Sequence, residues 1–137
     1  TTPVTLPDED FLRISAGISD LIAAAGGQRC PLVSAFSGFR ELPTPSNPTQ
    51  VEAAVGVTLE ILRASAASAL EDQPGQATTI AATADDLEAE AAAQGYEPDW
   101  LNTAPGNVAL SNEEFQTAFE QYQQLTDELC FPGEAEG

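Results

Sequence analysis

A chain of 137 residues has the size of a single domain, and it is long enough to bury one hydrophobic core. It carries 22 acidic side chains against four basic ones, all arginines, so its net charge is −18 and its interaction with nucleic acid or anionic lipid is unfavourable. The chain has no histidine, which excludes Ser-His-Asp and Cys-His catalytic arrangements and every metal site that depends on histidine.

The chain begins with a short extended lead over residues 1–6, and a first helix is predicted over residues 7–25. Pro7 suits the first position of a helix, and the three acidic residues that follow it favour the positive end of the helix dipole. Apolar residues then recur at spacings of three and four, which is the pattern of a helix with one buried face. Gly26 and Gly27 end the helix because glycine readily adopts the left-handed conformation of a C-terminal cap.

A short second helix is predicted over residues 32–42, directly after Cys30 and Pro31. The proline-rich stretch that follows is a loop, because proline is excluded from helix interiors. The third helix is predicted over residues 48–71, with Asn47 as its N-cap.

The fourth predicted helix covers residues 76–94, and its apolar face is mostly alanine. Small side chains allow helices to approach closely, so this helix is expected to pack tightly against a neighbour. Residues 96–110 form a long irregular connection. The last helix is predicted to start at Ser111, which forms a capping box with Glu114, and to be followed by an acidic tail over residues 131–137.

The predicted core consists of large apolar residues that share helix faces. They are Phe11, Ile14, Ile18, Leu21, Ile22, Phe36, Phe39, Val55, Leu59, Leu62, Leu87, Phe115, Phe119, Tyr122, Leu125 and Leu129.

The two cysteines predict one structural disulfide between Cys30 and Cys130, because no CxxC motif is present. The predicted fold is therefore all-α: one domain over residues 1–137, a disulfide-tied bundle of four main helices plus one short helix. Reducing compartments disfavour such a bridge, so we expect a secreted or extracytoplasmic protein of the cell envelope. The start at Thr1, without methionine, is consistent with removal of a signal peptide. No apolar stretch is long enough to predict a transmembrane helix.

Three residues of the long connection are candidate contacts with a partner or ligand: Tyr96, Trp100 and Leu101. Aromatic residues on a long loop can anchor another molecule. The alternative is that Trp100 and Leu101 fold back and cover one end of the bundle.

Asp85, Asp86, Glu88 and Glu90 form the densest acidic cluster and are a candidate weak cation patch. A straight helix cannot supply the six to eight oxygens that calcium prefers, so a solvated helix face is the alternative and no metal site is predicted.

These observations predict a non-enzymatic protein without a cofactor, which acts through protein–protein interaction, for example as an accessory subunit of a surface complex. A basic protein would complement its charge. A second hypothesis is a carrier that holds a small apolar ligand, a lipid or a pigment, between its helices. In helix number and in the Cys30–Cys130 pairing, the chain also resembles the small acidic helical porins of corynebacterial type, which implies an envelope channel as a third hypothesis.

Overall fold

The computed structural model describes residues 7–42, 45–97 and 112–131, and within these residues the chain is entirely helical. The prediction of an all-α, disulfide-tied fold is confirmed. The predicted lead over residues 1–6, most of the 96–110 connection and the tail from residue 132 lie outside the described residues. The helices are α1 (Asp8–Ala25), α2 (Arg29–Arg40), α3 (Pro48–Ala69), α4 (Pro74–Ala93) and α7 (Glu113–Cys130).

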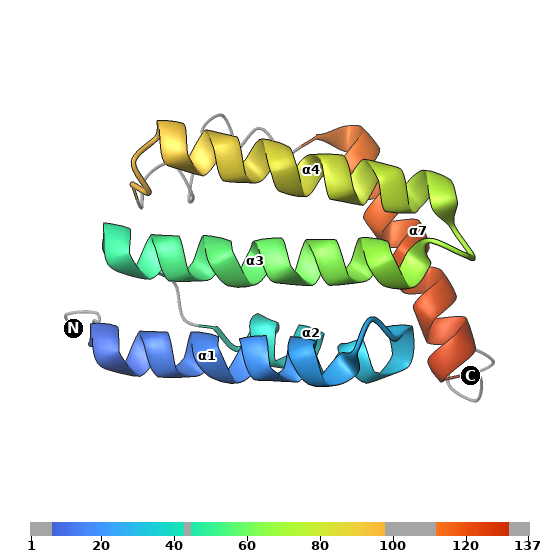
Figure 1. The fold of residues 1–137 in the computed structure, drawn as a ribbon, viewed down its shortest axis with the longest axis horizontal. Coiled ribbons are helices and arrows are strands. Elements are labelled where there is room, and N and C mark those ends of the chain that lie inside the picture. Colours follow the sequence, from blue (N-terminus) through green and yellow to red (C-terminus); the bar gives the residue numbers. More distant parts are fainter. Residues whose placement is uncertain (1–6, 43–44, 98–111, 132–137) are drawn as a thin grey trace, which may run out of the picture.

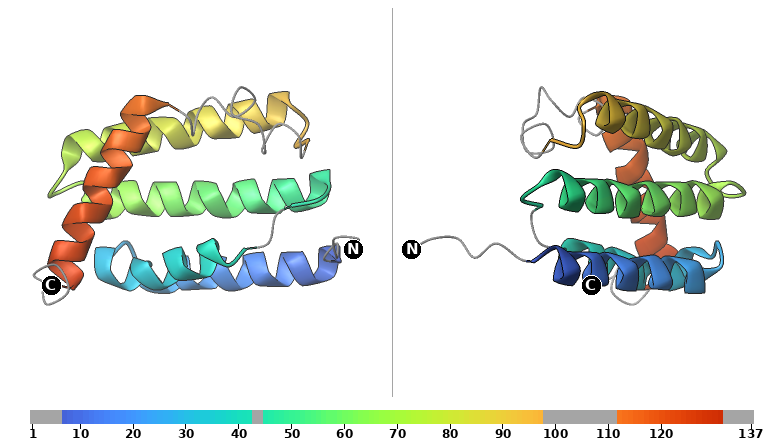
Figure 2. Two further views of the ribbon diagram at one scale, coloured as in Figure 1. Left: turned by 180° about the vertical axis from the view of Figure 1, so that it is seen from behind. Right: turned by 60° about the vertical axis from the view of Figure 1, so that its left-hand side comes forward.

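Three of the helices, α1, α3 and α4, lie side by side with α3 in the middle (Figure 1). The other two, α2 and α7, lie on the same side of this layer (Figure 2). The short helix α2 runs along α1, whereas α7 crosses the layer at one end. The most extensive packing joins α3 to α4, as the alanine-rich face of α4 predicts.

The main core lies where α3, α4 and α7 meet. Its largest side chain is Tyr122, which is fully buried and belongs to a run of aromatic rings with Phe119 and Phe36. Two smaller clusters join α1 and α2 to α3. The buried apolar residues of the main cluster are Val51, Val55, Leu59, Leu62, Ala66, Ala69, Ala77, Ile80, Ala84, Leu87, Ala91, Phe115, Ala118 and Tyr122.

Three residues predicted for the core are exposed: Ile14, Leu21 and Leu129. Helix α1 packs on α2 and α3 alone, so its apolar stripe is wider than the surface that covers it. Leu129 lies at the end of α7 and is 54% exposed. Thr126 is buried one turn before the end of α7, so the inward face of the crossing helix differs from the stripe that its leucines predict.

The helix ends follow local chemistry. Gly26 closes α1 in the left-handed conformation, with φ 58°. Asn47 caps α3, because its side chain accepts a hydrogen bond from the backbone N–H of Gln50 at 2.9 Å. The predicted Ser111 cap is wrong: α7 begins at Glu113, and Asn112 accepts hydrogen bonds from the first N–H groups of this helix.

Helix α2 begins at Arg29, three residues before the predicted start, and so it contains Cys30. Pro31 lies in its first turn, where the missing N–H of proline removes no helical hydrogen bond. This shift moves Cys30 from a loop onto a helix.

Candidate interaction site at the disulfide end of the bundle

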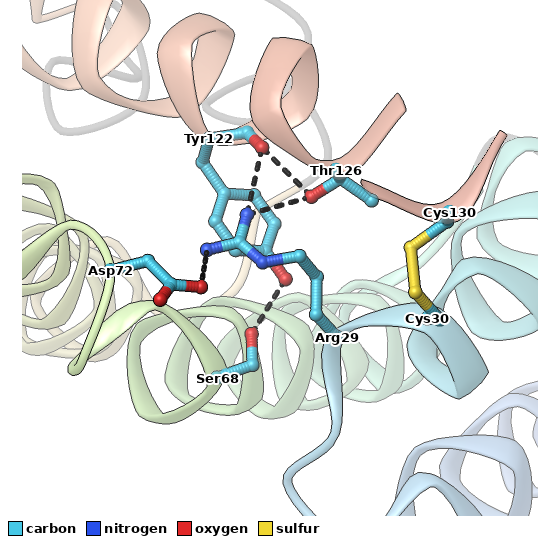
Figure 3. Close-up of a disulfide and its surroundings, with 7 residues drawn as sticks. All are labelled: Arg29, Cys30, Ser68, Asp72, Tyr122, Thr126 and Cys130. Carbon is cyan, nitrogen blue, oxygen red and sulfur yellow. Dashed lines mark hydrogen bonds and ion pairs between the residues drawn. A yellow bond between two sulfur atoms is a disulfide. The ribbon is translucent and has the colours of Figure 1, made fainter. Parts of the chain in front are cut away.

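The predicted disulfide is present and joins the first turn of α2 to the last residue of α7. The Cα atoms of Cys30 and Cys130 are 5.5 Å apart, and the bridge spans 100 residues of sequence. The prediction placed the bridge between the ends of the first and last helices. The structure places it between α2 and α7, at the end of the bundle that we call the disulfide end (Figure 3).

Arg29, next to Cys30, is a buried cation at this end. Its guanidinium donates hydrogen bonds to the carbonyl oxygen of Tyr122 at 3.1 Å and to Thr126 Oγ1 at 2.9 Å. It also donates to Gln73 Oε1 at 3.2 Å, in the turn between α3 and α4. Arg29 therefore joins the start of α2 to both α7 and the α3–α4 turn.

Two further contacts complete the surroundings of Arg29 (Figure 3). The guanidinium carbon lies 4.4 Å from the centroid of the Tyr122 ring, which is within the range of a cation–π interaction. A carboxylate oxygen of Asp72 lies 3.8 Å from the guanidinium and compensates its charge from the solvent side. The Tyr122 hydroxyl in turn shares a hydrogen bond of 2.7 Å with Ser68 on α3. Helices α2, α3 and α7 are thus held by polar contacts beside the disulfide.

A hollow of about 520 Å³ opens next to this cluster. Its walls come from the start of α2, the end of α3 and the end of α7. Two leucines on its edge project into solvent, Leu70 with 63% and Leu129 with 54% of its surface exposed. The lining residues are Gly27, Gln28, Arg29, Cys30, Pro31, Ala67, Ser68, Leu70, Glu71, Asp72 and Leu129.

An apolar groove of about 360 Å³ runs between α3 and α4 and continues this hollow. Ala67 and Leu70 line both depressions, so Leu70 stands at their junction. The remaining residues of the groove are small: Ala66, Ala77, Thr78 and Ala81.

The structure places the sequence-predicted contact residues elsewhere. Tyr96 is partly buried and packs against the main core, just beyond α4, with φ 57°. Trp100 and Leu101 lie outside the described residues.

The predicted acidic cluster is divided between two environments. Arg63 on α3 pairs with Asp85 at 3.2 Å and with Glu88 at 3.5 Å, so part of the cluster is neutralised from the neighbouring helix. Asp86 is exposed, and Glu90 is partly buried. Within the described part of the chain, no three carboxylates or cysteines are grouped to hold a metal ion. The weak cation patch stays a prediction.

Sequence reasoning missed the Arg29 cluster. The residue follows a Gly-Gly-Gln turn, which is the usual context of an exposed side chain, and its partners lie more than 90 residues away on α7. One signal was available: Arg29 is one of only four basic residues, and it adjoins a cysteine.

Comparison with known proteins adds no name to this geometry. The chain matches no protein-family model, and the searches of curated proteins and of solved structures gave no match either. Of the helices that the structure describes, none has both the length and the apolar character that a membrane-spanning segment requires.

Proposed function

We propose that the protein is an exported, non-enzymatic binding protein whose partner is a protein with a basic surface. The proposal rests on how the arginines are used. Arg29 is buried, while Arg13 and Arg63 pair with carboxylates of their own chain. Only Arg40 is an exposed arginine without such a pair in the described residues. The charge presented to another molecule is therefore even more one-sided than the composition, and it attracts cationic surfaces.

The disulfide supports the exported location. Bridges of this kind persist in oxidising compartments and are rare where glutathione keeps thiols reduced. Cys30 is exposed, so a reducing solution has access to the bridge. Long exposure to a reducing compartment would therefore favour the two free thiols.

The rigidity of the disulfide end supports a role in binding. A surface that is held in place before the partner arrives loses less conformational entropy when the complex forms. The covalent bridge and the Arg29 contacts hold the three helices that form this surface.

The two other functions expected from the sequence, an apolar-ligand carrier and an envelope channel, stay predictions. The hollow and the groove described above open at the surface. Between α3, α4 and α7 the space is filled by the side chains of the main core.

The proposal is tested by photo-cross-linking of the full chain in the extracytoplasmic fraction of the cells that produce it, followed by mass spectrometry and measurement of affinity with the purified partner. We expect a stoichiometric partner with a basic surface. Its affinity should fall by about tenfold between 50 and 200 mM salt, because the attraction between the two surfaces is screened. An acidic partner, or an affinity that does not depend on salt, would contradict the proposal.

Thiol alkylation of protein collected without reductant tests the exported location separately. The chain should be recovered with both cysteines blocked to alkylation, and recovery of two free thiols would rule out the oxidising compartment.

A further inference from the structure

We propose that the basic partner docks at the disulfide end and inserts a lysine or arginine side chain, flanked by apolar residues, into the hollow between Leu70 and Leu129. We call the hollow together with the α3–α4 groove the docking face. This inference rests on the proposed function, and it adds the location of the contact and the chemistry of the segment that binds there.

The apolar part of the docking face is concentrated. Singly exposed leucines are ordinary on a protein surface. Here Leu70 and Leu129 come from different helices and border the same hollow, although they are 63% and 54% exposed. Their burial by a partner would remove apolar surface from water at a place where the protein offers a concave shape.

The groove extends this apolar surface away from the hollow. It starts at Leu70 and Ala67 and continues over the alanines of α3 and α4. Alanine side chains are short, so a bound segment can bring its backbone close to these helices. A segment that lies in the groove would therefore reach the hollow at Leu70.

The charges at the hollow select a cation. Glu71 and Asp72 are exposed on its edge, at the carboxyl end of α3, where the helix dipole is negative. The last turn of α3 contains no basic residue. The cation of the site, Arg29, is buried and directed towards Tyr122 and Thr126, so it does not neutralise the outer edge.

Lysine and arginine match this combination of groups. Their aliphatic stems pack against apolar side chains, and their charged ends reach carboxylates at the edge of the same site. A purely apolar segment would leave Glu71 and Asp72 facing an uncharged surface, and an acidic segment would be repelled by them.

The inference is tested by NMR titration of the isotopically labelled full chain, in its oxidised form, with three synthetic peptides of equal length. The first combines leucine with lysine, the second combines serine with lysine, and the third combines leucine with glutamate. We expect the leucine–lysine peptide to shift the amide signals of Gln28, Cys30 and Ser68 at the hollow. The serine–lysine peptide should bind about tenfold more weakly, because it offers charge without apolar contact.

Two exposed substitutions at the site have matched controls on the same molecule. Glu71→Gln should weaken binding of the leucine–lysine peptide by about fivefold, whereas Glu52→Gln, which removes an exposed carboxylate earlier on α3, should change it less than about twofold. Leu70→Ser should weaken it by about tenfold, whereas Leu12→Ser on α1 should have little effect. All four side chains are exposed, so the variants should fold, and their amide spectra provide the check.

The outcomes separate the two proposals. Binding that shifts amides at another acidic surface, with Glu71→Gln and Glu52→Gln equally harmful, would overturn the docking face and leave the basic partner supported. Equal binding of the leucine–glutamate peptide would overturn the cationic occupant. Failure of both lysine peptides to bind at low salt would overturn the proposed basic partner itself.

Discussion

The two ends of the bundle join distant parts of the chain by different means. At the end where α1 and α3 begin, a carboxylate oxygen of Asp8 accepts hydrogen bonds from Asn47 at 2.8 Å and from Gln50 at 3.0 Å. At the disulfide end the fastening is a covalent bond together with the buried Arg29. One end therefore depends on neutral amides around a carboxylate, and the other on a covalent bond and a buried cation.

The difference follows the length of chain that each end closes. Asp8 and Gln50 are 42 residues apart, whereas Cys30 and Cys130 are separated by 100 residues. The entropy lost when a loop closes grows with its length, so the longer closure is the more expensive one. Helix α7 also crosses its neighbours instead of running alongside them, and the disulfide end compensates for this shorter contact (Figure 1).

Removal of the disulfide should have the largest effect on this comparison. With both Cys30 and Cys130 changed to serine, the chain-entropy model for a loop of this length predicts a loss of about 4–5 kcal/mol in the free energy of unfolding. Urea denaturation measures the loss. Amide hydrogen exchange should show α7 losing protection before the start of α1 and α3. A loss below about 1 kcal/mol would show that α7 is held by its packing.

Substitution of the buried cation should come next. Arg29→Ala removes three hydrogen bonds and the contact with the Tyr122 ring, so we expect a loss of about 3 kcal/mol. Arg29→Lys retains the charge without the planar fork and should recover less than half of this loss. Arg63→Ala is the control, because its ion pairs are exposed and should contribute about 0.5 kcal/mol or less. Equal losses in the Arg29 and Arg63 variants, measured by urea denaturation, would contradict the role of Arg29.

Arg29 also shows how far the sequence could predict this fold. The helices follow from apolar periodicity, proline and glycine, and the disulfide follows from a count of two cysteines. These signals are local or arithmetic. The burial of Arg29 depends on a carbonyl and a hydroxyl of α7, and the crossing of α7 that brings them there has no signature in local periodicity. The docking face was missed for the same reason, because its leucines belong to different helices.

At the opposite end, Gln50 should contribute more than the other amides. Its side chain is fully buried, and its oxygen accepts hydrogen bonds from the backbone N–H and the hydroxyl of Ser46, both at 3.0 Å. Gln50→Ala leaves these donors and Asp8 without that partner, and should cost about 2 kcal/mol. Gln76→Ala, at an exposed hydrogen bond with Gln121, should cost about 0.5 kcal/mol or less. Thermal unfolding of the two variants provides the comparison, and similar melting temperatures would remove Gln50 from the account of this end.

The smallest expected effect concerns the caps. Asn47→Ala and Asn112→Ala should each cost about 1 kcal/mol, because each removes the side chain that accepts the first N–H groups of a helix. Asn47 also donates to Asp8, and Asn112 has no such contact with α1 among the described residues. A double-mutant cycle with Asp8→Ala should therefore give a coupling of about 0.5–1 kcal/mol for Asn47 and none for Asn112. Equal coupling at both caps would mean that Asn47 stabilises α3 alone. The start of α1 would then be held by Gln50 and by packing, and the contrast between the two ends of the bundle would rest on one buried amide.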